Sequence, residues 1–404
     1  MPRLRVGILG CGAVAQVAHL PSLRELDDRF EIVALCDVDA GTVDAVGEVY
    51  GIGRRHGELD DLLRERLDAV FVLTSGDHHE AVLAALEAGM HVFVEKPLTY
   101  TFDATDEIVA TSEARGRHVM VGMRRRYDAG YLRAAAAVAE LRDLRHVDVR
   151  ILHPENDLFL RQLRIRRGRE PAKASTSTPM LLGRHFDAAL QEWILSAQPQ
   201  ERLAELAVSH APEHLLTAFF LLSSSIHDVN ALRGVLGEPT EVIAAEAWGG
   251  GTQLTTVLAF GPAVRATYTW SFLPHLRQYV HHYTFVSSEA RVHLELPSPF
   301  IGSAPTVVGL ESMRGGELVC TEVTPPFELA FTRELVHFHE CIAYGRRPLT
   351  DARDFRCDLE VLHAIAAAFA DARAPAFAST WQRLVGVQLV HHRSSTVGRR
   401  YRQP

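Results

Sequence analysis

Two positions of this 404-residue chain have the residue types and spacing needed for proton transfer. The first is Lys96 in "VFVEKP", where Pro97 disfavours helix at the preceding residue and keeps Lys96 extended at the end of a buried strand. A partly desolvated lysine has a lowered pKa and can bind or deprotonate a substrate hydroxyl. The second is "LLSSSIHDVNAL", where Ser223, His227 and Asn230 follow the i, i+4, i+7 spacing of one helical face. An imidazole placed there can act as a general acid or base.

Both positions also have a structural interpretation. Lys96 could be a solvated loop lysine, and Ser223 to Ser225 could cap a helix whose histidine belongs to the core. A serine hydrolase is not favoured, because the chain has no G-x-S-x-G elbow around these serines. Ser223 can orient an imidazole by hydrogen bonding but brings no negative charge, so we expect His227 to be mainly neutral at pH 7. Lys96 must then take the larger part of the proton transfer.

The N-terminal stretch "RLRVGILGCGAVAQVAHLPSL" predicts a strand, a glycine turn and a helix. Gly10 and Gly12 allow a sharp turn and close approach of a pyrophosphate, and Ala15 is the small residue that packs helix on strand. The helix N-terminus then faces the phosphates. A second strand, "EIVALCDVD", ends in Asp37, whose carboxylate can accept hydrogen bonds from ribose hydroxyls and would repel a 2′-phosphate. The pattern therefore favours NAD over NADP.

The elements that position these residues are predicted by alternating strand and helix patterns. Apolar strand runs at 68–74, 91–97 and 118–122 alternate with helical patterns at 78–90 and 103–116, which predicts a doubly wound parallel sheet. Ligands bind such sheets at the carboxyl ends of the strands, where Lys96 and the loop 74–80 lie. From 240 to 323 the runs become short and alternating, which predicts antiparallel strands.

Composition narrows the function classes. Lys+Arg 42 against Asp+Glu 50 gives a net charge of −8, so no nucleic-acid partner is expected. The five cysteines have no metal-ligand spacing, and the paired histidines have no companion ligands, so we expect no metal site and a reducing compartment. No signal peptide pattern or long apolar run is recognised, so the expected location is the cytoplasm, with no membrane partner.

Four stretches, "GILGCGAVA", "CDVDA", "ALEAGMHVFVEKPL" and "VMVGMRRRYDAGY", together resemble the glucose–fructose oxidoreductase / inositol dehydrogenase / MocA family. The resemblance covers 3 to about 150, then 221–239 and 331–373. It implies an N-terminal Rossmann domain and a C-terminal α+β domain with an open, mostly antiparallel sheet. The boundaries expected are 1–125 for the NAD-binding domain, 126–373 for the substrate and oligomerisation domain, whose late helices return toward the first domain, and 374–404 for an extension.

The resemblance also implies roles for particular residues. Lys96 is the expected catalytic lysine and His227 the expected catalytic histidine, with Ser223 beside it. The residues expected at the cofactor are Gly10, Gly12, Ala13, Val14, Asp37, Thr74, His79, Glu95 and Lys96. The residues expected at the substrate are Arg126, Tyr127, Asn230, His275 and Tyr279.

The sequence departs from the family pattern in three places. Ser75 and Gly76 replace the family's Pro-Asn or Pro-Pro before the loop histidine, and Ser223 and Asn230 replace two helix carboxylates. The third departure is an insertion at about 155–220. Its basic part, 160–179, could bind an anionic substrate group or be a solvated face. Its later part, 184–222, predicts two short helices over the substrate cleft or at a subunit contact.

The function expected from this resemblance is an NAD(H)-dependent oxidoreductase acting on a sugar, aminosugar or cyclitol, assembled as a homodimer or homotetramer. One alternative retains NAD and uses transient oxidation for epimerisation, elimination or glycoside cleavage. Another is a non-catalytic NAD-binding sensor, which the loss of both helix carboxylates keeps open.

Overall fold

The computed structural model describes residues 3–154, 163–166, 200–298, 301, 304–326 and 328–371. The chain up to Ala370 forms one compact unit. Most of the basic stretch 160–179 lies outside the described residues, as do Trp193 and Leu195 of the predicted helical insertion and the extension 374–404.

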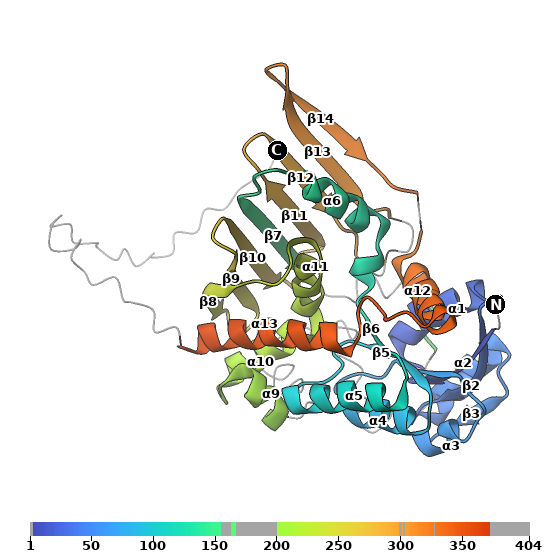
Figure 1. The fold of residues 1–404 in the computed structure, drawn as a ribbon. Coiled ribbons are helices and arrows are strands. Elements are labelled where there is room, and N and C mark those ends of the chain that lie inside the picture. Colours follow the sequence, from blue (N-terminus) through green and yellow to red (C-terminus); the bar gives the residue numbers. More distant parts are fainter. Residues whose placement is uncertain are drawn as a thin grey trace, which may run out of the picture. The chain divides into compact units, whose positions relative to one another are not determined.

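The N-terminal part is a six-stranded, all-parallel sheet in the order β3-β2-β1-β4-β5-β6, as predicted (Figure 1). Its strands are β1 (Leu4–Leu9), β2 (Phe30–Cys36), β3 (Arg54–His56), β4 (Ala69–Val72), β5 (His91–Glu95) and β6 (Val119–Gly122). The helices between them are η1 (Ala15–His19), α1 (Leu20–Glu25), α2 (Ala40–Tyr50), α3 (Leu59–Leu63), α4 (His79–Glu87) and α5 (Phe102–Arg115). Strands β4 and β6 are buried at every position, which explains their continuous apolar sequences. The strand order reverses beside β1, and sheets of this kind bind their ligands at the carboxyl ends of the strands at that point, here β1 and β4.

The second sheet has eight strands in the order β14-β13-β12-β11-β7-β10-β9-β8. It is antiparallel except that β7 pairs with β10 in parallel, so the predicted mostly antiparallel sheet is confirmed. Its strands are β7 (His146–His153), β8 (Glu241–Trp248), β9 (Gln253–Phe260), β10 (Val264–Phe272), β11 (Val280–Val286), β12 (Ala290–Glu295), β13 (Val307–Arg314) and β14 (Glu317–Val323). Strand β7 was not predicted, although its alternate residues are buried as in a strand with one covered face.

Helices connect the two sheets. The short 3-10 helix η2 (Arg124–Tyr127) and α6 (Ala129–Ala139) follow β6, and α9 (Gln200–Ala207) is the first described helix of the insertion. The late helices are α12 (Ala330–Tyr344) and α13 (Ala352–Asp371). Helix α12 packs against α1 and η2, and its Leu335 and Phe338 are completely buried in a core shared with β1 and β4. A late helix of the chain thereby supports the N-terminal parallel sheet.

The stretch that contains His227 is a continuous helix. It consists of α10 (Pro212–Phe220), a π-helical turn η4 (Leu221–Ser225) and α11 (Ile226–Leu236). By length and composition it could cross a membrane, but most of its apolar window is buried inside the protein, as in a core helix. The helix begins at Pro212 and no serine side chain caps α11, so the capping interpretation of Ser223 to Ser225 is wrong. Pro212 at the first helical position provides the start instead.

Candidate active site

The glycine turn after β1 is shaped for a dinucleotide. Gly10 has a φ of +93°, and a Cβ there would lie 2.8 Å from the Leu73 carbonyl carbon and from the Thr74 nitrogen. Only glycine can therefore bring β1 this close to the end of β4. At Gly12 a Cβ would meet no heavy atom within 4 Å, so open space lies in front of the turn where a pyrophosphate approaches.

Asp37 lies at the carboxyl end of β2 and faces the same turn. One of its carboxylate oxygens accepts the backbone N–H of Cys11 at 2.7 Å, and the other accepts that of Asp39 at 2.9 Å. These bonds fix the carboxylate beside the glycine turn while leaving lone pairs for ribose hydroxyls. The residues present therefore fit NAD.

The two histidines at the end of the loop after β4 have different surroundings, and the expected cofactor contact of His79 stays a prediction. His79 is partly buried at the start of α4 and pairs with the exposed Glu107 of α5 at 2.8 Å. His78 is the buried one, and its ring nitrogens contact the carbonyl oxygens of Thr74 at 2.9 Å and Pro97 at 2.7 Å. His78 thus connects the loop after β4 with the loop after β5. The sequence analysis missed it because a His-His pair does not show which ring faces inward.

Two described parts of the insertion contact the loops expected to hold the cofactor. The Gln16 side chain donates to the Cys11 carbonyl at 2.8 Å and to the Arg166 carbonyl at 2.9 Å, and it accepts the Arg166 N–H at 2.7 Å. Arg202 of α9 donates to Asp77, in the loop after β4, at 2.7 Å. The insertion therefore touches the dinucleotide loop and the β4 loop.

Lys96 leaves β5 and reaches the helix that contains His227. Its Nζ donates to the backbone carbonyl of Ser223 at 3.0 Å. That carbonyl lies in the π turn η4, where the usual i to i+4 pattern is interrupted. Burial lowers the pKa of Lys96, and the charges of Arg124 and Arg125 lower it further, while Glu95 opposes them. The amine is thus nearer to giving up its proton than a solvated lysine.

Glu95 precedes Lys96 and lies on the opposite side of β5. It contacts Nε2 of the fully buried His19 at 2.7 Å. Burial acts to raise the pKa of Glu95, but the contact with His19 and the charge of Lys96 outweigh it and leave that pKa below its usual value. Glu95 is therefore an ionised carboxylate that is held by His19 and lies next to Lys96 in the sequence.

His227 and Ser223 do not interact as the sequence analysis expected. The Ser223 hydroxyl and Nδ1 of His227 are both buried and have no hydrogen-bond partner among the described residues. The π turn accounts for this, because its wider repeat shifts Ser223 out of line with the i+4 position. Ser223 contributes its backbone carbonyl to Lys96 instead. Burial lowers the pKa of His227 well below its ordinary value, helped by Arg125 and Lys96, so the imidazole is neutral as expected.

Asp228, the next residue, is the centre of a buried polar network that the sequence analysis missed. Arg125 donates to its carboxylate, as do the Tyr283 hydroxyl and, at 3.4 Å, the Tyr268 hydroxyl. His281 Nε2 lies 2.7 Å from the same carboxylate. Burial acts to raise the pKa of Asp228, but Arg125 and His281 hold it far below the usual range. The available signal was an aspartate inside an apolar helix, which must find partners when buried.

The network also fixes the protonation of His281. Burial and the charge of Arg125 lower its pKa to about 4, although Asp228 opposes them. A neutral ring that donates from Nε2 to Asp228 can accept at Nδ1, where the Tyr279 hydroxyl lies at 2.9 Å. Tyr279 is therefore at the edge of this network, close to Arg124 and Arg125. His275 is exposed in the connection between β10 and β11.

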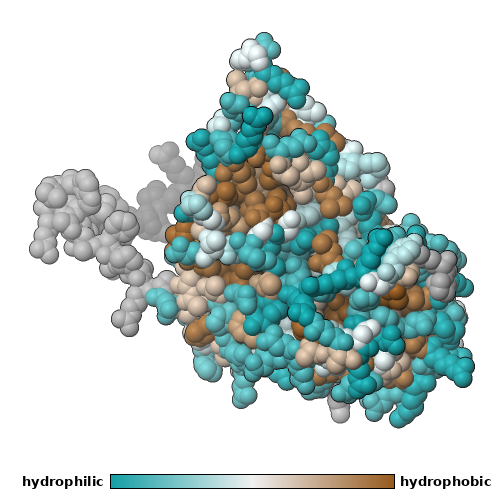
Figure 2. Space-filling view, viewed as in Figure 1, coloured by the Kyte–Doolittle hydropathy of each residue, from teal (hydrophilic) through white to brown (hydrophobic). Residues whose placement is uncertain are grey.

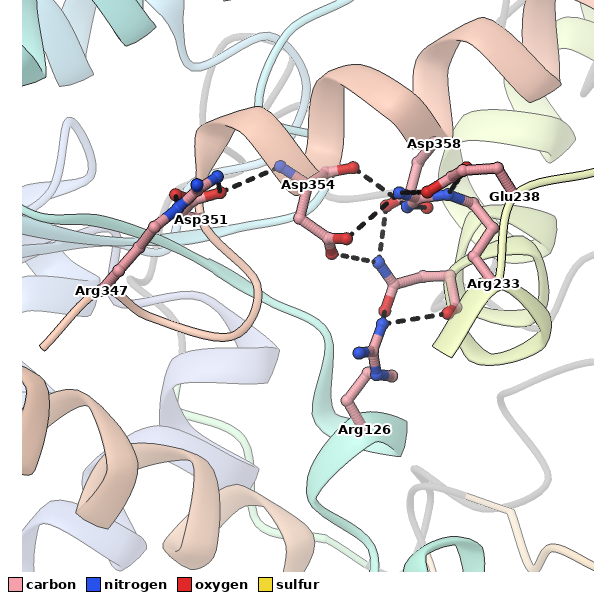
Figure 3. Close-up of polar contacts among 8 residues, drawn as sticks. Arg126, Arg233, Glu238, Arg347, Asp351, Asp354 and Asp358 are labelled. Atoms are coloured by element: carbon pink, nitrogen blue, oxygen red, sulfur yellow. Dashed lines mark hydrogen bonds and ion pairs between the residues drawn. The ribbon is translucent and has the colours of Figure 1, made fainter. Parts of the chain in front are cut away.

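Asn230 and Arg126 belong to a second polar network. The Asn230 amide donates to Asp354 and Asp358, each at 2.7 Å, and Arg126 donates to the Asn230 carbonyl at 3.3 Å. Arg233 pairs with Asp354 and Asp358 across the same contact (Figure 3). These bonds fasten α11 to α13, so Asn230 has its amide committed to structural partners.

Tyr127 likewise has a structural partner. Its side chain is buried, and its hydroxyl lies 2.9 Å from the Thr350 hydroxyl. Thus, of the five residues expected at the substrate, Tyr279 contacts the network beside His227, while Arg126, Tyr127 and Asn230 are engaged elsewhere. Their assignment as substrate contacts stays a prediction.

Comparisons with known proteins agree with this architecture. The family described as "Oxidoreductase family, NAD-binding Rossmann fold" (GFO_IDH_MocA) matches residues 4–123. Inositol 2-dehydrogenase 3 of Saccharopolyspora erythraea is 41% identical over 130 residues, which are 32% of this chain and 38% of that protein. Inositol 2-dehydrogenase of Paracoccus denitrificans is 37% identical over 34% of this chain and 42% of that protein. The match thus covers about two fifths of the length of these relatives.

Solved structures extend the likeness in fold to nearly the whole chain. An aldose-aldose oxidoreductase from Caulobacter crescentus, complexed with glycerol, is similar with a TM-score of 0.68 and 22% identity over 92% of this chain and 99% of that one. A 3-ketoreductase from Actinomadura kijaniata in complex with NADP has a TM-score of 0.66 and 19% identity over 91% and 98%. Residues 4–123 thus match the NAD-binding Rossmann domain of the Gfo/Idh/MocA oxidoreductase family, and the solved structures share the fold of the rest of the chain.

Proposed function

We propose that this protein is an NAD(H)-dependent oxidoreductase that acts on a hydroxyl or ketone of a sugar, aminosugar or cyclitol. The observation that carries the proposal is the contact of Lys96 with the His227 helix, 3.0 Å from Nζ to the Ser223 carbonyl. It joins a partly desolvated amine at the end of β5 to the helix that carries a neutral imidazole, in the same parallel sheet as the glycine turn that follows β1.

In the oxidative direction, bound NAD would accept the hydride from the substrate carbon. Lys96 in its neutral form takes the hydroxyl proton, and its lowered pKa makes that form more accessible than in a solvated lysine. His227, neutral and with an unpaired Nδ1, can share or relay this proton. In reduction the protonated lysine returns the proton to the carbonyl oxygen.

Asp37 supports NAD over NADP, because a carboxylate fixed by two backbone N–H groups cannot turn away from a 2′-phosphate. The matched inositol dehydrogenases support a polyhydroxy substrate. For catalysis, the test is NADH formation on a panel of neutral and acidic sugars and cyclitols, comparing wild type with Lys96→Met. We expect Lys96→Met to lose at least about 100-fold in turnover while NAD binding changes little. Near-normal turnover in Lys96→Met would refute the proposed role of the lysine.

A second candidate is an enzyme that retains NAD between turnovers. The contacts of Gln16 with Arg166, and of Asp77 with Arg202, join the insertion to two loops beside the proposed cofactor site and favour slow release. Absorbance of the purified protein at the NADH band, followed by product analysis without net NADH formation, would establish this candidate. Bound NADH with no product on any substrate would instead support a sensor.

We also propose that copies of the chain associate through the eight-stranded sheet. Hydrophobic residues gather on the part of the surface that this sheet occupies (Figure 2). Large exposed apolar side chains of this sheet are Ile243 and Trp248 on the edge strand β8, Leu318 on the edge strand β14 and Met313 on β13. Apolar surface of this kind is typical of protein contacts. Light scattering of wild type and Trp248→Glu tests the proposal, with a smaller assembly expected for the variant.

A further inference from the structure

Arg124 occupies a position next to the catalytic lysine through strand pairing. Strands β5 and β6 are neighbours, and Glu95 is paired with Gly122 in their register. Lys96 follows Glu95 directly, and Arg124 follows Gly122 by two residues as the first residue of η2. Because the carboxyl ends of parallel strands meet at one edge of a sheet, both cations emerge at the same place.

Among the three consecutive arginines of η2, Arg124 differs from the other two. Arg125 forms a buried ion pair with Asp228, and Arg126 donates to the Asn230 carbonyl. Arg124 makes no hydrogen bond and no ion pair with any residue in the described part of the chain. Its guanidinium lies over the Phe331 ring, 5.6 Å from the centroid. This contact supports the side chain but leaves its donors without acceptors.

The carboxyl groups nearest to Arg124 do not pair with it. Asp128 accepts the Tyr131 N–H at 2.8 Å and the Thr306 hydroxyl at 2.9 Å, as the cap of α6. Glu334 on α12 is completely buried, and both of its oxygens lack a hydrogen-bond partner. Burial raises the pKa of Glu334 well above its usual value, and the charge of Glu95 adds to this. Burial therefore favours the neutral form of Glu334, which is a poor counter-ion for Arg124.

Residues of the proposed catalytic site also lie close enough to Arg124 to be affected by its charge. Its charge lowers the pKa of both Lys96 and His227, and the Tyr279 phenol is another neighbour. Helix η2 packs against α11, which carries His227. A guanidinium with free donors thus stands beside the two residues proposed to handle the substrate proton, in a partly buried position where an ion pair is stronger than in water.

We propose that Arg124 binds an anionic group of the substrate, so that the substrate of this protein is an acidic polyol bearing a carboxylate or a phosphate. The inference rests on the proposed oxidoreductase function and specifies its substrate class. The planar guanidinium offers the paired donors that match two oxygens of either group. With the anion held by Arg124, a hydroxyl elsewhere on the same small molecule can reach Lys96.

The test compares acidic and neutral members of one substrate series on the NAD-loaded protein. D-glucuronate, D-galacturonate and D-glucose 6-phosphate are compared with D-glucose, D-galactose and myo-inositol, by NADH formation and by calorimetric binding. We expect wild type to prefer an acidic compound, and the carboxylate and phosphate arms show which anion is used. In Arg124→Met, the KM and dissociation constant for that compound should rise about 10- to 100-fold, as for loss of a charge-assisted contact. Values for the neutral analogue should change less than about threefold.

Arg124→Lys keeps the positive charge but loses the paired donors of the guanidinium. Its KM and dissociation constant for the acidic compound should lie between those of Arg124→Met and wild type. Arg346→Met is the matched control, because Arg346 is also stacked over an aromatic ring, that of Tyr344, but is exposed after α12. It should behave as wild type. Two outcomes overturn the inference: wild type prefers the neutral compounds, or Arg124→Met weakens NAD binding while leaving discrimination unchanged. If no compound is oxidised, the proposed oxidoreductase function is refuted, but the anion site is still tested by calorimetry. The anion site is refuted if none of the acidic compounds binds.

Discussion

Replacing Asp228 by asparagine removes the carboxylate that holds the buried network together. Asp228 and Arg125 expose 1% and 6% of their side chains, so the guanidinium would keep its charge without a buried counter-ion. Breaking a buried ion pair by removing one partner costs about 3 to 5 kcal/mol. The side chains of His281 and Tyr283 would also lose their ionised acceptor. We therefore expect Asp228→Asn to lower the free energy of unfolding by about 3 to 5 kcal/mol.

Urea unfolding at pH 7.5, followed by tryptophan fluorescence, measures this loss. Tyr283→Phe removes one hydrogen bond to the carboxylate and should cost about 1.5 to 3 kcal/mol. Tyr268→Phe should cost less, because its hydroxyl lies 3.4 Å from Asp228. Adding Arg125→Met to Asp228→Asn should restore part of the stability, since the uncompensated charge is then absent. A loss below about 1 kcal/mol in Asp228→Asn, with no recovery in the double variant, would refute the reasoning.

Three further predictions concern catalysis, cofactor choice and acid stability. His227→Ala should reduce turnover about 10²- to 10⁴-fold, whereas Ser223→Ala should stay within about threefold because only its carbonyl contacts Lys96; equal losses in steady-state assays would contradict this. NAD should bind more tightly than NADP in calorimetry, and Asp37→Ser should narrow the difference; tighter NADP binding by wild type would exclude the proposed role of the carboxylate. Burial lowers the pKa of His153 to about 4 in the folded protein, whereas the unfolded chain keeps a pKa of about 6.5. As the pH falls from about 6.5 to about 4, His153 is therefore protonated in the unfolded chain but not in the folded protein, and the free energy of unfolding decreases. His153→Gln should flatten that fall by up to about 1.4 kcal/mol per pH unit in urea titrations, and an unchanged slope would mean that His153 is protonated in the folded state.

The parallel sheet could be predicted because its buried strands have continuous apolar sequences. The turn after β1 could be predicted because no other residue type replaces glycine there. The turn at Gly10 needs a positive φ and a close backbone approach, and both requirements are visible in the residue type. The position of Lys96 at a strand end followed from Pro97 and the apolar run before it. Strand β7 was missed because its neighbours, β10 and β11, are more than 100 residues away in sequence.

The helix around His227 shows the limit of spacing arguments. The i, i+4 rule assumes a regular α-helix, whereas the π turn at Leu221–Ser225 changes the repeat just before His227. The predicted hydrogen bond from Ser223 to His227 is therefore absent, and the serine contacts Lys96 through its backbone. Nothing in the side-chain sequence indicates where such a turn will form.

The sequence by itself determined the fold class, the dinucleotide turn and the lysine at the strand end, because local backbone needs and burial fix those residue types. Only the tertiary structure decided which polar residues act together. Asp228, rather than Ser223 or Asn230, is the residue of α11 that binds the buried partners. Its donors come from η2, β10 and β11, which are distant from α11 in the sequence but pack around it. The same packing leaves Arg124 unpaired among three adjacent arginines, a distinction that no sequence pattern contains, because it depends on which neighbours already satisfy each charge.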